Sequence, residues 1–278
     1  MTAIINYIKD SLKDFYSGEE VKSFIRIIMK HVCSLEPHQL LIDKDRKLPE
    51  TQRLQIETIV AQLQIYEPIQ YILGMTTFYG RNYNVTPATL IPRPETEELV
   101  EYICCNEKES GLHVLDIGTG SGCIAISLAA LLCDAKLFAM DISKEALDVA
   151  KYNALNNGVQ VAFIEMDILS QPDFATPLDI IVSNPPYVLN DEKPGMERNV
   201  LDYEPHTALF VPDNDPLLFY REIAIFGQKH LTSNGRLYFE INAALGQATV
   251  DLLKEYNYRN VVLKQDIFGK DRMIKAEK

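Results

Sequence analysis

Residues 114–122 read VLDIGTGSG, and this stretch decides the expected fold. Its first residues form a largely apolar run typical of a buried strand, and the apolar residues 123–132 that follow indicate a helix. Glycine adopts positive φ and has no side chain, so such a turn aims free backbone N–H groups at a closely approaching ligand. NAD-binding folds use a related G-x-G-x-x-G turn, but Gly118, Gly120 and Gly122 are spaced G-x-G-x-G. The alternative is a tight turn with no ligand.

Strand and helix patterns alternate on the carboxyl side of this turn. We expect strands over residues 113–117, 136–140, 161–165, 178–183 and 236–241, and helices over residues 123–132, 144–155, 217–230 and 245–256. This alternation predicts an α/β fold with a doubly wound, mostly parallel sheet. Residues 261–264 and 273–276 lie too close together for an intervening helix. They are expected to form a hairpin that places one antiparallel strand in the sheet.

The first part of the chain has a different pattern. Apolar residues recur at helical spacing up to about Tyr66, which predicts a small helical bundle and an N-terminal domain over residues 1–75. Residues 76–92 mix aromatic side chains with glycine and asparagine and predict a β-hairpin linker. The α/β domain then covers residues 93–278. Pro94, followed by three glutamates within four residues, predicts the first turn of a helix.

Composition narrows the class of protein. The 278 residues are 47% hydrophobic and 24% charged, which is ordinary for a globular chain, and the net charge of -12 disfavours a stable nucleic-acid partner. The five cysteines include no C-x-x-C pair and the five histidines lack metal-ligand spacing, so we expect free thiols and no metal. No apolar run approaches the roughly 20 residues of a membrane span. These features predict a cytoplasmic protein without a membrane partner.

Acidic residues near the ends of two further strands extend the expected ligand site. Asp141 is placed where a carboxylate can accept hydrogen bonds from both ribose hydroxyls of a nucleoside; the alternative is a cap for the helix near Ser143. Asp167 can meet an adenine amino group, or form a cap or turn, and Ile168 offers the ring a flat apolar contact. The predicted cofactor site also includes the glycine turn with its flanking residues, Asp116, Gly118, Thr119, Gly120, Ser121 and Gly122.

Residues 184–187 read NPPY and follow an expected buried strand, beside the switch point where doubly wound sheets bind ligands. An amide or amino nitrogen is a poor nucleophile because its lone pair is delocalised. Asn184 Oδ1 and the Pro185 carbonyl can accept both of its N–H groups and orient it toward an electrophilic methyl group. Pro185 and Pro186 stiffen the turn, and the Tyr187 ring can pack on a planar amide or base. The alternative is a loop that only ends a strand.

The chain resembles the release factor glutamine methyltransferase family of the HemK/PrmC type. The resemblance covers nearly the whole length and includes the helical N-terminal domain, the glycine turn and the NPPY loop. Three further runs carry it: PIQYILG at residues 68–74, FYG at 78–80 and LIPRPETE at 90–97. NPPY also occurs in methyltransferases that act on the amino group of adenine, whereas IPRPETE is much more discriminating.

The resemblance implies a class I methyltransferase fold with a Rossmann-like sheet and S-adenosylmethionine as methyl donor. It also implies a peptide chain release factor as partner, with the glutamine of its Gly-Gly-Gln motif as target. By the match, the cofactor contacts residues 118–122, Asp141, Ile168 and Asn184, and the substrate glutamine contacts residues 184–187. Asn184, Pro185 and Tyr187 are the expected catalytic residues. Two departures are visible: Ile168 stands where an aromatic residue is common, and residues 210–216 lack the glycines usual there.

Four other functions use some of the same features. A DNA or RNA amino-methyltransferase would apply the same loop to a flipped base, but it should carry a basic groove, which this acidic chain does not indicate. A ribosomal protein glutamine methyltransferase is not separated by sequence chemistry. Intact acceptors at Asn184 disfavour a protein that only senses S-adenosylmethionine. The glycine spacing and the lack of a hydride-site His or Lys disfavour an NAD oxidoreductase.

Overall fold

The structure is a computed structural model that describes residues 1–36, 38–39 and 47–278. The chain divides into two compact units, which we call unit 1 (Met1–Gly74 with Glu197–Tyr203) and unit 2 (Met75–Met196 with Glu204–Lys278). Residues 37 and 40–46 of the expected helical domain lie outside the described residues. No sequence feature indicated that the short segment Glu197–Tyr203 would join the N-terminal helices.

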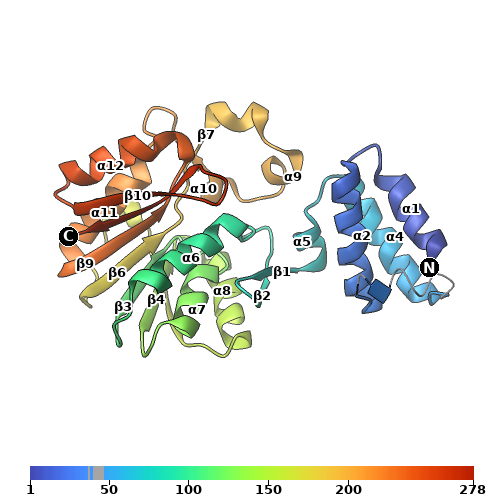
Figure 1. Ribbon diagram of the computed structural model, residues 1–278, viewed down its shortest axis with the longest axis horizontal. Helices are drawn as coiled ribbons and strands as arrows, with labels where there is room; N and C mark the ends of the chain where they lie inside the picture. The colour runs from blue at the N-terminus through green and yellow to red at the C-terminus, as the bar shows by residue number, and fades with distance from the viewer. Residues whose placement is uncertain (37, 40–46) are drawn as a thin grey trace. The chain divides into compact units, whose positions relative to one another are not determined.

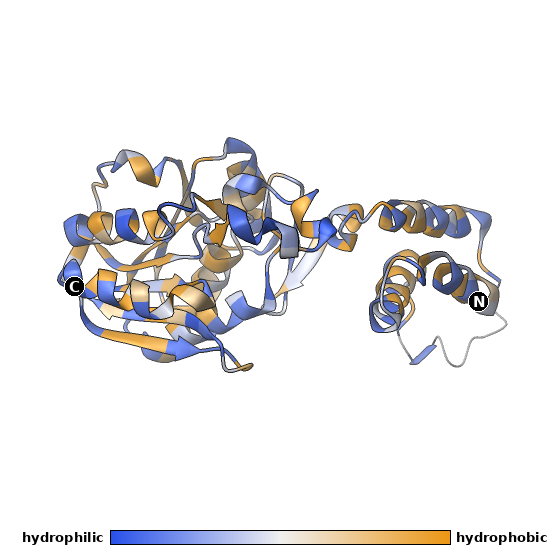
Figure 2. Ribbon diagram, turned by 90° about the horizontal axis from the view of Figure 1, so that it is seen from above, coloured by the Kyte–Doolittle hydropathy of each residue, from blue (hydrophilic) through white to orange (hydrophobic). Residues whose placement is uncertain are grey.

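Unit 1 is built from amphipathic helices. They are α1 (Thr2–Leu12), α2 (Gly18–Cys33), α4 (Glu50–Gln64) and the short α5 (Ile69–Leu73). Orange and blue residues alternate along them in Figure 2, as helical spacing of apolar residues requires. The apolar residues pack into one core that includes Ile8, Leu12, Ile28 and Leu63, all fully buried. The predicted helical bundle is therefore present in the described part of this segment.

Two side chains attach the segment Glu197–Tyr203, which contains α9 (Arg198–Leu201), to the end of the α4 region. The Tyr203 hydroxyl donates a hydrogen bond to the Ile65 carbonyl at 2.7 Å, and the Arg198 guanidinium lies 4.4 Å from the centre of the Tyr66 ring. A cation over an aromatic face is attracted by the ring quadrupole. These contacts give a physical reason for grouping the segment with unit 1.

Unit 2 contains a seven-stranded sheet in the order β10-β11-β9-β6-β3-β4-β5. Its strands are β3 (His113–Ile117), β4 (Lys136–Asp141), β5 (Val161–Glu165), β6 (Leu178–Ser183), β9 (Leu231–Glu240), β10 (Arg259–Gln265) and β11 (Asp271–Glu277). Neighbours from β9 to β5 run parallel, whereas β11 is antiparallel to both β9 and β10. The predicted α/β fold with one reversed strand in a terminal hairpin is thus confirmed.

Helices cover both faces of this sheet (Figure 1). One face carries α6 (Pro94–Asn106), α7 (Cys123–Leu131) and α8 (Lys144–Asn156), and the other carries α11 (Leu218–His230) and α12 (Gly246–Glu255). Successive strand residues point to opposite faces. Val114 and Ile180 therefore join the core with α6 to α8, whereas Leu115 and Ile181 join the core with α11 and α12. Burial on both faces explains the continuous apolar runs in the sequence.

One strand begins earlier than its sequence pattern predicts. The apolar pattern predicts a strand from residue 236, but β9 already pairs with β6 at Leu231, opposite Leu178. The register then shifts between Leu178 and Ile180. Residues 232–235 are polar or glycine and look like a turn, so periodicity alone misses the irregular first half of the strand.

Smaller elements fill the connections of unit 2. The predicted hairpin is present as the antiparallel pair β1 (Met75–Phe78) and β2 (Arg81–Asn84). The strands β7 (Val188–Leu189) and β8 (Phe210–Val211) form a short parallel pair, and short helical turns lie at η1 (Ile168–Ser170), η2 (Asn190–Gly195), α10 (His206–Leu209) and η3 (Ala243–Leu245). Within the described ranges, no helix is both long and apolar enough to cross a membrane.

The chain order around β3 determines where a ligand can bind. From β3 the chain proceeds outward through β4 to β5, and then returns to form β6 on the opposite side of β3. This reversal is the switch point of a doubly wound sheet, where the loops after two adjacent strands diverge and leave a crevice. The Ser183 hydroxyl donates to the Ile117 carbonyl at 2.7 Å and joins the last residues of these two strands.

Candidate functional site

A cavity of about 340 Å³ opens at this switch point, at the carboxyl ends of β3, β4, β5 and β6. Most of the residues predicted to bind a cofactor or substrate line it: Gly118, Gly120, Asp141, Asp167, Ile168, Asn184, Pro185 and Pro186. They come from four separate loops, and the parallel sheet brings them together because the carboxyl ends of parallel strands meet at one edge. The volume lies in the range of small-molecule sites.

The glycine turn takes a backbone path that favours glycine. Gly118, Gly120 and Gly122 have φ values of 73°, 53° and 81°, a region that costs most L-residues about 1–2 kcal/mol. At Gly122, which precedes α7, an added Cβ would also lie 3.1 Å from the Cβ of Ala150. The turn is fixed to β4 because the Gly118 N–H donates to the Met140 carbonyl at 2.9 Å.

Asp141 connects the end of β4 to this turn. Its Oδ2 accepts from the Gly120 N–H at 2.9 Å, and its Oδ1 accepts from the Ser143 N–H at 2.9 Å. Burial raises the pKa of Asp141. The role of capping α8 belongs to Ser143, whose hydroxyl oxygen accepts from the Ala146 N–H at 3.1 Å. The carboxylate of Asp141 therefore braces the turn at the cavity wall.

Asp116 and Tyr187, with Thr119, Ser121 and Gly122, were predicted site residues that the structure places outside the cavity lining. Asp116 is fully buried; its Oδ2 accepts from the Thr119 hydroxyl at 2.6 Å and from the Ala125 N–H at 3.2 Å. Burial raises its pKa to about 7. Within the described residues its Oδ1 has no hydrogen-bond partner. The Asp116 carboxyl therefore supports the turn through Thr119 and the start of α7.

Asp167 and Ile168 form the third side of the cavity, after β5. Asp167 caps the short turn η1 because its Oδ1 accepts from the Leu169 N–H at 2.9 Å. Ile168 is buried and belongs to the core beneath α11, while one side of it lines the cavity. Asp167 thus forms the turn that was its alternative role, and Ile168 is an apolar part of the cavity wall; contact of either residue with adenine stays a prediction.

The NPPY loop after β6 is held by a buried polar network. Asn184 donates through Nδ2 to the Thr96 hydroxyl at 3.3 Å, and Thr96 donates to Glu240 Oε2 at 2.7 Å. The Tyr187 hydroxyl donates to Glu240 Oε1 at 3.1 Å. Burial and the neighbouring Glu240 raise the pKa of Tyr187, and burial raises the pKa of Glu240 itself.

The sequence did not single out several residues that shape this region. Thr96 lies in the quoted run of residues 90–97 without an assigned role, and Glu240 ends β9, where a carboxylate on an otherwise apolar strand is a signal in itself. Ile142 is 62% exposed and lines the cavity directly after Asp141. No periodicity could find it, because it stands in a loop.

Two further polar side chains tie distant segments to the site. Buried Asn153 of α8 donates to the Ser121 carbonyl at 2.9 Å and exchanges two hydrogen bonds with the Asn84 backbone, which joins the hairpin to the glycine turn. Glu204 accepts from the Ile91 N–H at 3.2 Å and from Arg93 at 2.5 Å. Asn84 and Asn153 are 69 residues apart in sequence, and Glu204 is 111 or more residues from its partners, so only the fold brings them together.

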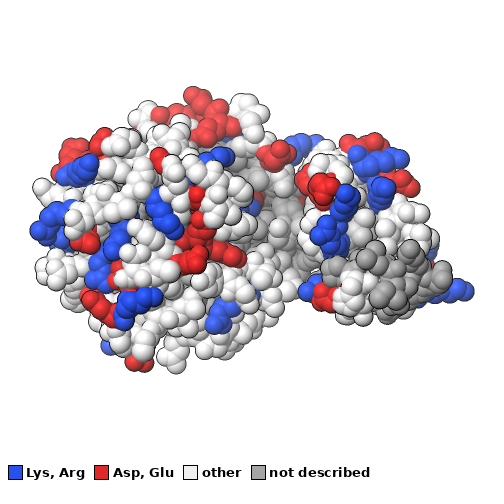
Figure 3. Space-filling model, in the orientation of Figure 1, with Lys and Arg blue, Asp and Glu red and all other residues white. Residues whose placement is uncertain are grey.

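Charges of both signs cover the face of unit 2 that Figure 3 shows, with a group of acidic side chains near its middle. One hollow on the surface of unit 2 is lined by four glutamates of α6: Glu95, Glu97, Glu98 and Glu101. The surface therefore follows the acidic composition of the chain, and the face in view carries no continuous basic region.

Comparisons with known proteins agree with this architecture. Residues 3–74 match the family model described as the PrmC N-terminal domain, and residues 96–200 match the Methyltransferase small domain. A solved Thermus thermophilus 16S rRNA N2 methyltransferase, in complex with AdoMet and guanosine, aligns with a TM-score of 0.54 at 18% identity over 73% of this chain and 49% of its own. A methyltransferase from Pyrococcus furiosus aligns with a TM-score of 0.52 at 16% identity over 83% and 99%. These likenesses show the fold.

Two relatives are similar over nearly their whole length. The release factor glutamine methyltransferase of Flavobacterium psychrophilum is 52% identical, and the match covers 96% of this chain and 95% of that protein. The protein of the same name from Bacteroides thetaiotaomicron is 48% identical over the full length of both. With such identity over both units, the chain belongs to the release factor glutamine methyltransferase family.

Proposed function

We propose that the protein transfers the methyl group of S-adenosylmethionine to the side-chain amide nitrogen of a glutamine in peptide chain release factors, the glutamine of their Gly-Gly-Gln motif. The names of the relatives support this assignment. The observation that carries it within the structure is the orientation of Asn184. Its amide nitrogen is held on Thr96, no described residue donates to its Oδ1, and Asn184 lines a nucleoside-sized cavity.

The cavity fits S-adenosylmethionine. Gly118 and Gly120 have no side chains, so a ligand can approach the turn closely, although their own N–H groups are bonded to Met140 and Asp141. Asp141 offers carboxylate oxygens for ribose hydroxyls, and Ile142 with Ile168 supplies apolar contact for adenine. We assign Asp167 to the adenine amino group. When bound, S-adenosylmethionine supplies a methyl group on a positively charged sulfur, which is an excellent leaving group. The protein therefore needs no acid or nucleophile of its own to activate the donor.

The work of the NPPY loop is to orient the glutamine amide. Asn184 Oδ1 and the Pro185 carbonyl accept its two N–H groups, which fixes the amide plane and directs the nitrogen lone pair. Pro185 and Pro186 lack backbone N–H groups, so the loop presents acceptors without competing donors. We assign Tyr187 and Pro186 to packing against the planar amide. Restricting the geometry of two reactants in this way is a large source of rate enhancement.

We also propose that the protein acts in the cytoplasm, where release factors work, and holds no stable nucleic-acid or membrane partner. The net charge of -12 supports the absence of a nucleic-acid partner, because a phosphate-binding surface needs clustered lysine and arginine. We place the functional boundaries at residues 1–75 for the helical domain, 76–92 for the hairpin linker and 93–278 for the methyltransferase domain. The short segment Glu197–Tyr203 is the part of that last domain that groups with unit 1.

A methylation assay tests the function directly. The purified protein is incubated with methyl-labelled S-adenosylmethionine and a release factor, and mass mapping identifies the modified residue. The matched control is the same release factor with its Gly-Gly-Gln glutamine replaced, beside ribosomal proteins and DNA as other acceptors. Label on that glutamine alone is the expected result. Equal labelling of the replaced factor, or transfer only to ribosomal protein or DNA, would overturn the substrate assignment.

A further inference from the structure

Glu240 is a buried carboxylate at the end of β9 that receives two hydroxyl donors. The Thr96 hydroxyl donates to Oε2 at 2.7 Å and the Tyr187 hydroxyl to Oε1 at 3.1 Å. These donors come from the first turn of α6 and from the NPPY loop, and Glu240 and Thr96 are both buried. Among the described residues, Glu240 forms no ion pair. Such a group costs stability to bury, so its place at the site calls for a reason.

The direction of these hydrogen bonds decides how Asn184 is turned. A hydroxyl has one hydrogen, and Thr96 commits it to a carboxylate that can only accept. The Thr96 oxygen can therefore only accept from Asn184, which fixes the Asn184 nitrogen on Thr96 at 3.3 Å. The amide oxygen of Asn184 then points the other way. If residue 240 could donate, Thr96 could donate to Asn184 and the amide could turn over.

We propose that Glu240, acting through the Thr96 hydroxyl, is the positioning residue that makes Asn184 present an acceptor and not a donor to the glutamine amide. This inference rests on the proposed function. The same carboxylate holds the Tyr187 hydroxyl, so one buried group sets both ends of the NPPY loop. A second side chain restrains the loop from the same strand end, because Asn242 donates to the Tyr187 carbonyl at 3.1 Å.

Two nearby charges act on the Glu240 carboxyl in opposite directions. The charge of Arg272 on β11 opposes the effect of burial on Glu240, while Glu95 on α6 adds to it. The hydrogen-bond partner of the Arg272 guanidinium is Asp266, at 3.3 Å, and not Glu240. Thr96 is the third residue of α6, in the middle of the PETE run. A buried hydroxyl there gives that run a role in the reaction beyond starting a helix.

Three variants test the proposal in single-turnover methylation of a release factor. Thr96→Val removes the hydroxyl at nearly constant size, Thr96→Ser keeps it, and Glu240→Gln replaces a pure acceptor by a group that also donates. We expect Thr96→Val and Glu240→Gln to lower the transfer rate about tenfold or more, with little change in KM or in the affinity for S-adenosylhomocysteine. Thr96→Ser should retain activity within about threefold.

Matched controls separate positioning from loss of fold. Thr249→Val removes a buried hydroxyl of α12 that donates to the Leu245 carbonyl just before that helix, and Glu107→Gln changes a buried glutamate that accepts from Tyr238. Neither touches the NPPY loop, so both should keep the wild-type transfer rate. A double-mutant cycle tests whether the effect of Thr96→Val on the transfer rate depends on Asn184, which a purely structural role of Thr96 would not require. In an Asn184→Ala background, Thr96→Val should lower the residual rate by less than about twofold, because its effect passes through Asn184.

The outcomes separate the two proposals. If the wild type does not methylate the release factor, the proposed function fails. If the wild type does and folded Thr96→Val or Glu240→Gln transfers at the wild-type rate, the function stands and the positioning role is wrong. Equal losses from Thr96→Val with and without Asn184 would likewise overturn the role, because the two residues would then act independently.

Discussion

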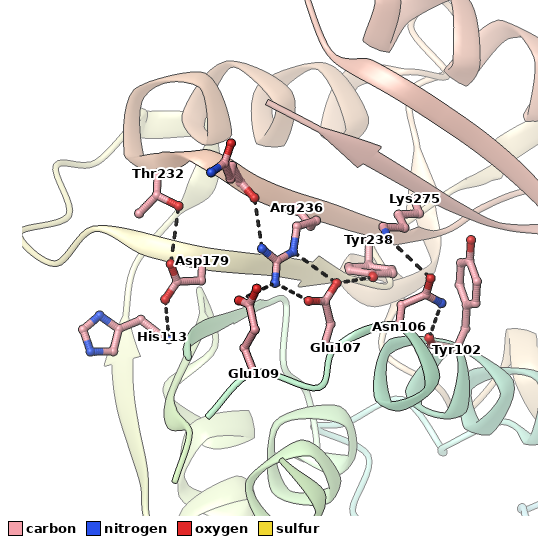
Figure 4. A network of polar contacts seen from close by, with 11 residues as sticks. Tyr102, Asn106, Glu107, Glu109, His113, Asp179, Thr232, Arg236, Tyr238 and Lys275 are labelled. Carbon is pink, nitrogen blue, oxygen red and sulfur yellow. Dashed lines mark hydrogen bonds and ion pairs between the residues drawn. The ribbon is translucent and has the colours of Figure 1, made fainter. Parts of the chain in front are cut away.

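Helix α6 is attached to strand β9 at both ends by a buried glutamate, and the two attachments differ in charge. At the first turn of α6, Thr96 donates to Glu240, which has only neutral hydroxyl donors. At the other end, Glu107 receives two donors from the Arg236 guanidinium and one from the Tyr238 hydroxyl at 2.6 Å (Figure 4). We call these the site cluster and the structural cluster.

The buried glutamate of the structural cluster is paired with an arginine, and the cluster extends to the amino ends of the strands. Arg236 neutralises Glu107 and also lies near Glu109 at 3.4 Å, while Asp179 accepts from the His113 N–H at 2.9 Å (Figure 4). Among the residues that the structure describes, no cation is paired with the carboxylate of the site cluster. A paired charge or an apolar residue at this position would give a more stable fold than a buried carboxylate without a cation. The difference accords with our proposal that the arrangement at the carboxyl edge orients Asn184, whereas the arrangement at the amino edge stabilises the fold.

The largest expected effect breaks the structural cluster. Glu107→Ala leaves the Arg236 guanidinium, which is only 13% exposed, without its main partner. Breaking one partner of a buried ion pair costs about 3–5 kcal/mol, so the free energy of unfolding of unit 2 should fall by that amount. Denaturant unfolding measures it. Methyl transfer per folded molecule should stay at the wild-type level. A large fall in the transfer rate of the folded molecules would show that the two clusters are not separate in function.

The next effect breaks the site cluster without touching stability. Asn184→Ala removes the proposed acceptor for the glutamine amide, and single-turnover transfer should fall about 10²–10³-fold, as for other oriented donors or acceptors in active sites. The melting temperature and much of the affinity for S-adenosylhomocysteine should persist. The matched control is Asn106→Ala at the structural end, where the amide donates to the Tyr102 carbonyl. Near-normal transfer by folded Asn184→Ala would exclude the mechanism.

A smaller effect concerns a second carboxylate at the carboxyl edge. Asp141→Ala should weaken S-adenosylhomocysteine binding by about 1.5–3 kcal/mol, the range for hydrogen bonds to a charged group. Part of the loss comes through Gly120, whose N–H donates to Asp141 at 2.9 Å. Titration calorimetry measures it, with Asp148→Ala as the control, since Asp148 is an exposed carboxylate of α8 that pairs with Lys151 outside the cavity. An unchanged affinity would reduce Asp141 to a support for the turn, and binding of NAD in its place would overturn the cofactor assignment.

The smallest effect is a pH dependence of stability that the carboxyl edge should show. Burial raises the pKa of Asp116 to about 7, above its unfolded value, so its contribution is full at low pH and is lost as the pH rises through about 7. Asp116→Asn does not titrate. Between about pH 5 and pH 7 the wild type should lose about 1–2 kcal/mol relative to this variant. Thermal unfolding at a series of pH values checks the sign, and parallel curves would contradict it.

Much of the site could be predicted from local patterns. The glycine turn at residues 118–122 and the NPPY loop each follow an apolar strand directly, so a strand pattern places both at the carboxyl edge. Glycine permits a backbone path that other residues avoid, and proline fixes φ, so both act locally wherever they occur. The hairpin of β10 and β11 followed from the short interval between two apolar runs. In each case the information lies within a few residues of the feature.

Other parts depend on residues that are distant in the chain. Glu240 meets Thr96 across 144 residues and Tyr187 across 53, and neither spacing follows from periodicity. The early start of β9 depends on a partner strand, since residues 232–235 carry no strand pattern of their own. The grouping of Glu197–Tyr203 with unit 1 depends on Tyr66 and Ile65, more than 130 residues earlier.

The sequence by itself determined the α/β class, the glycine turn that can approach a nucleoside and the NPPY loop with its acceptor groups. Each of these depends on the backbone preferences and the apolar pattern of residues that are neighbours in the chain. Only the tertiary structure decided which way Asn184 faces. That choice rests on where one hydroxyl proton of Thr96 goes, and the proton is directed by a carboxylate on another strand. Hydrogen-bond polarity passes through space and not along the chain, so the residue that sets the acceptor can be found only after the sheet is assembled.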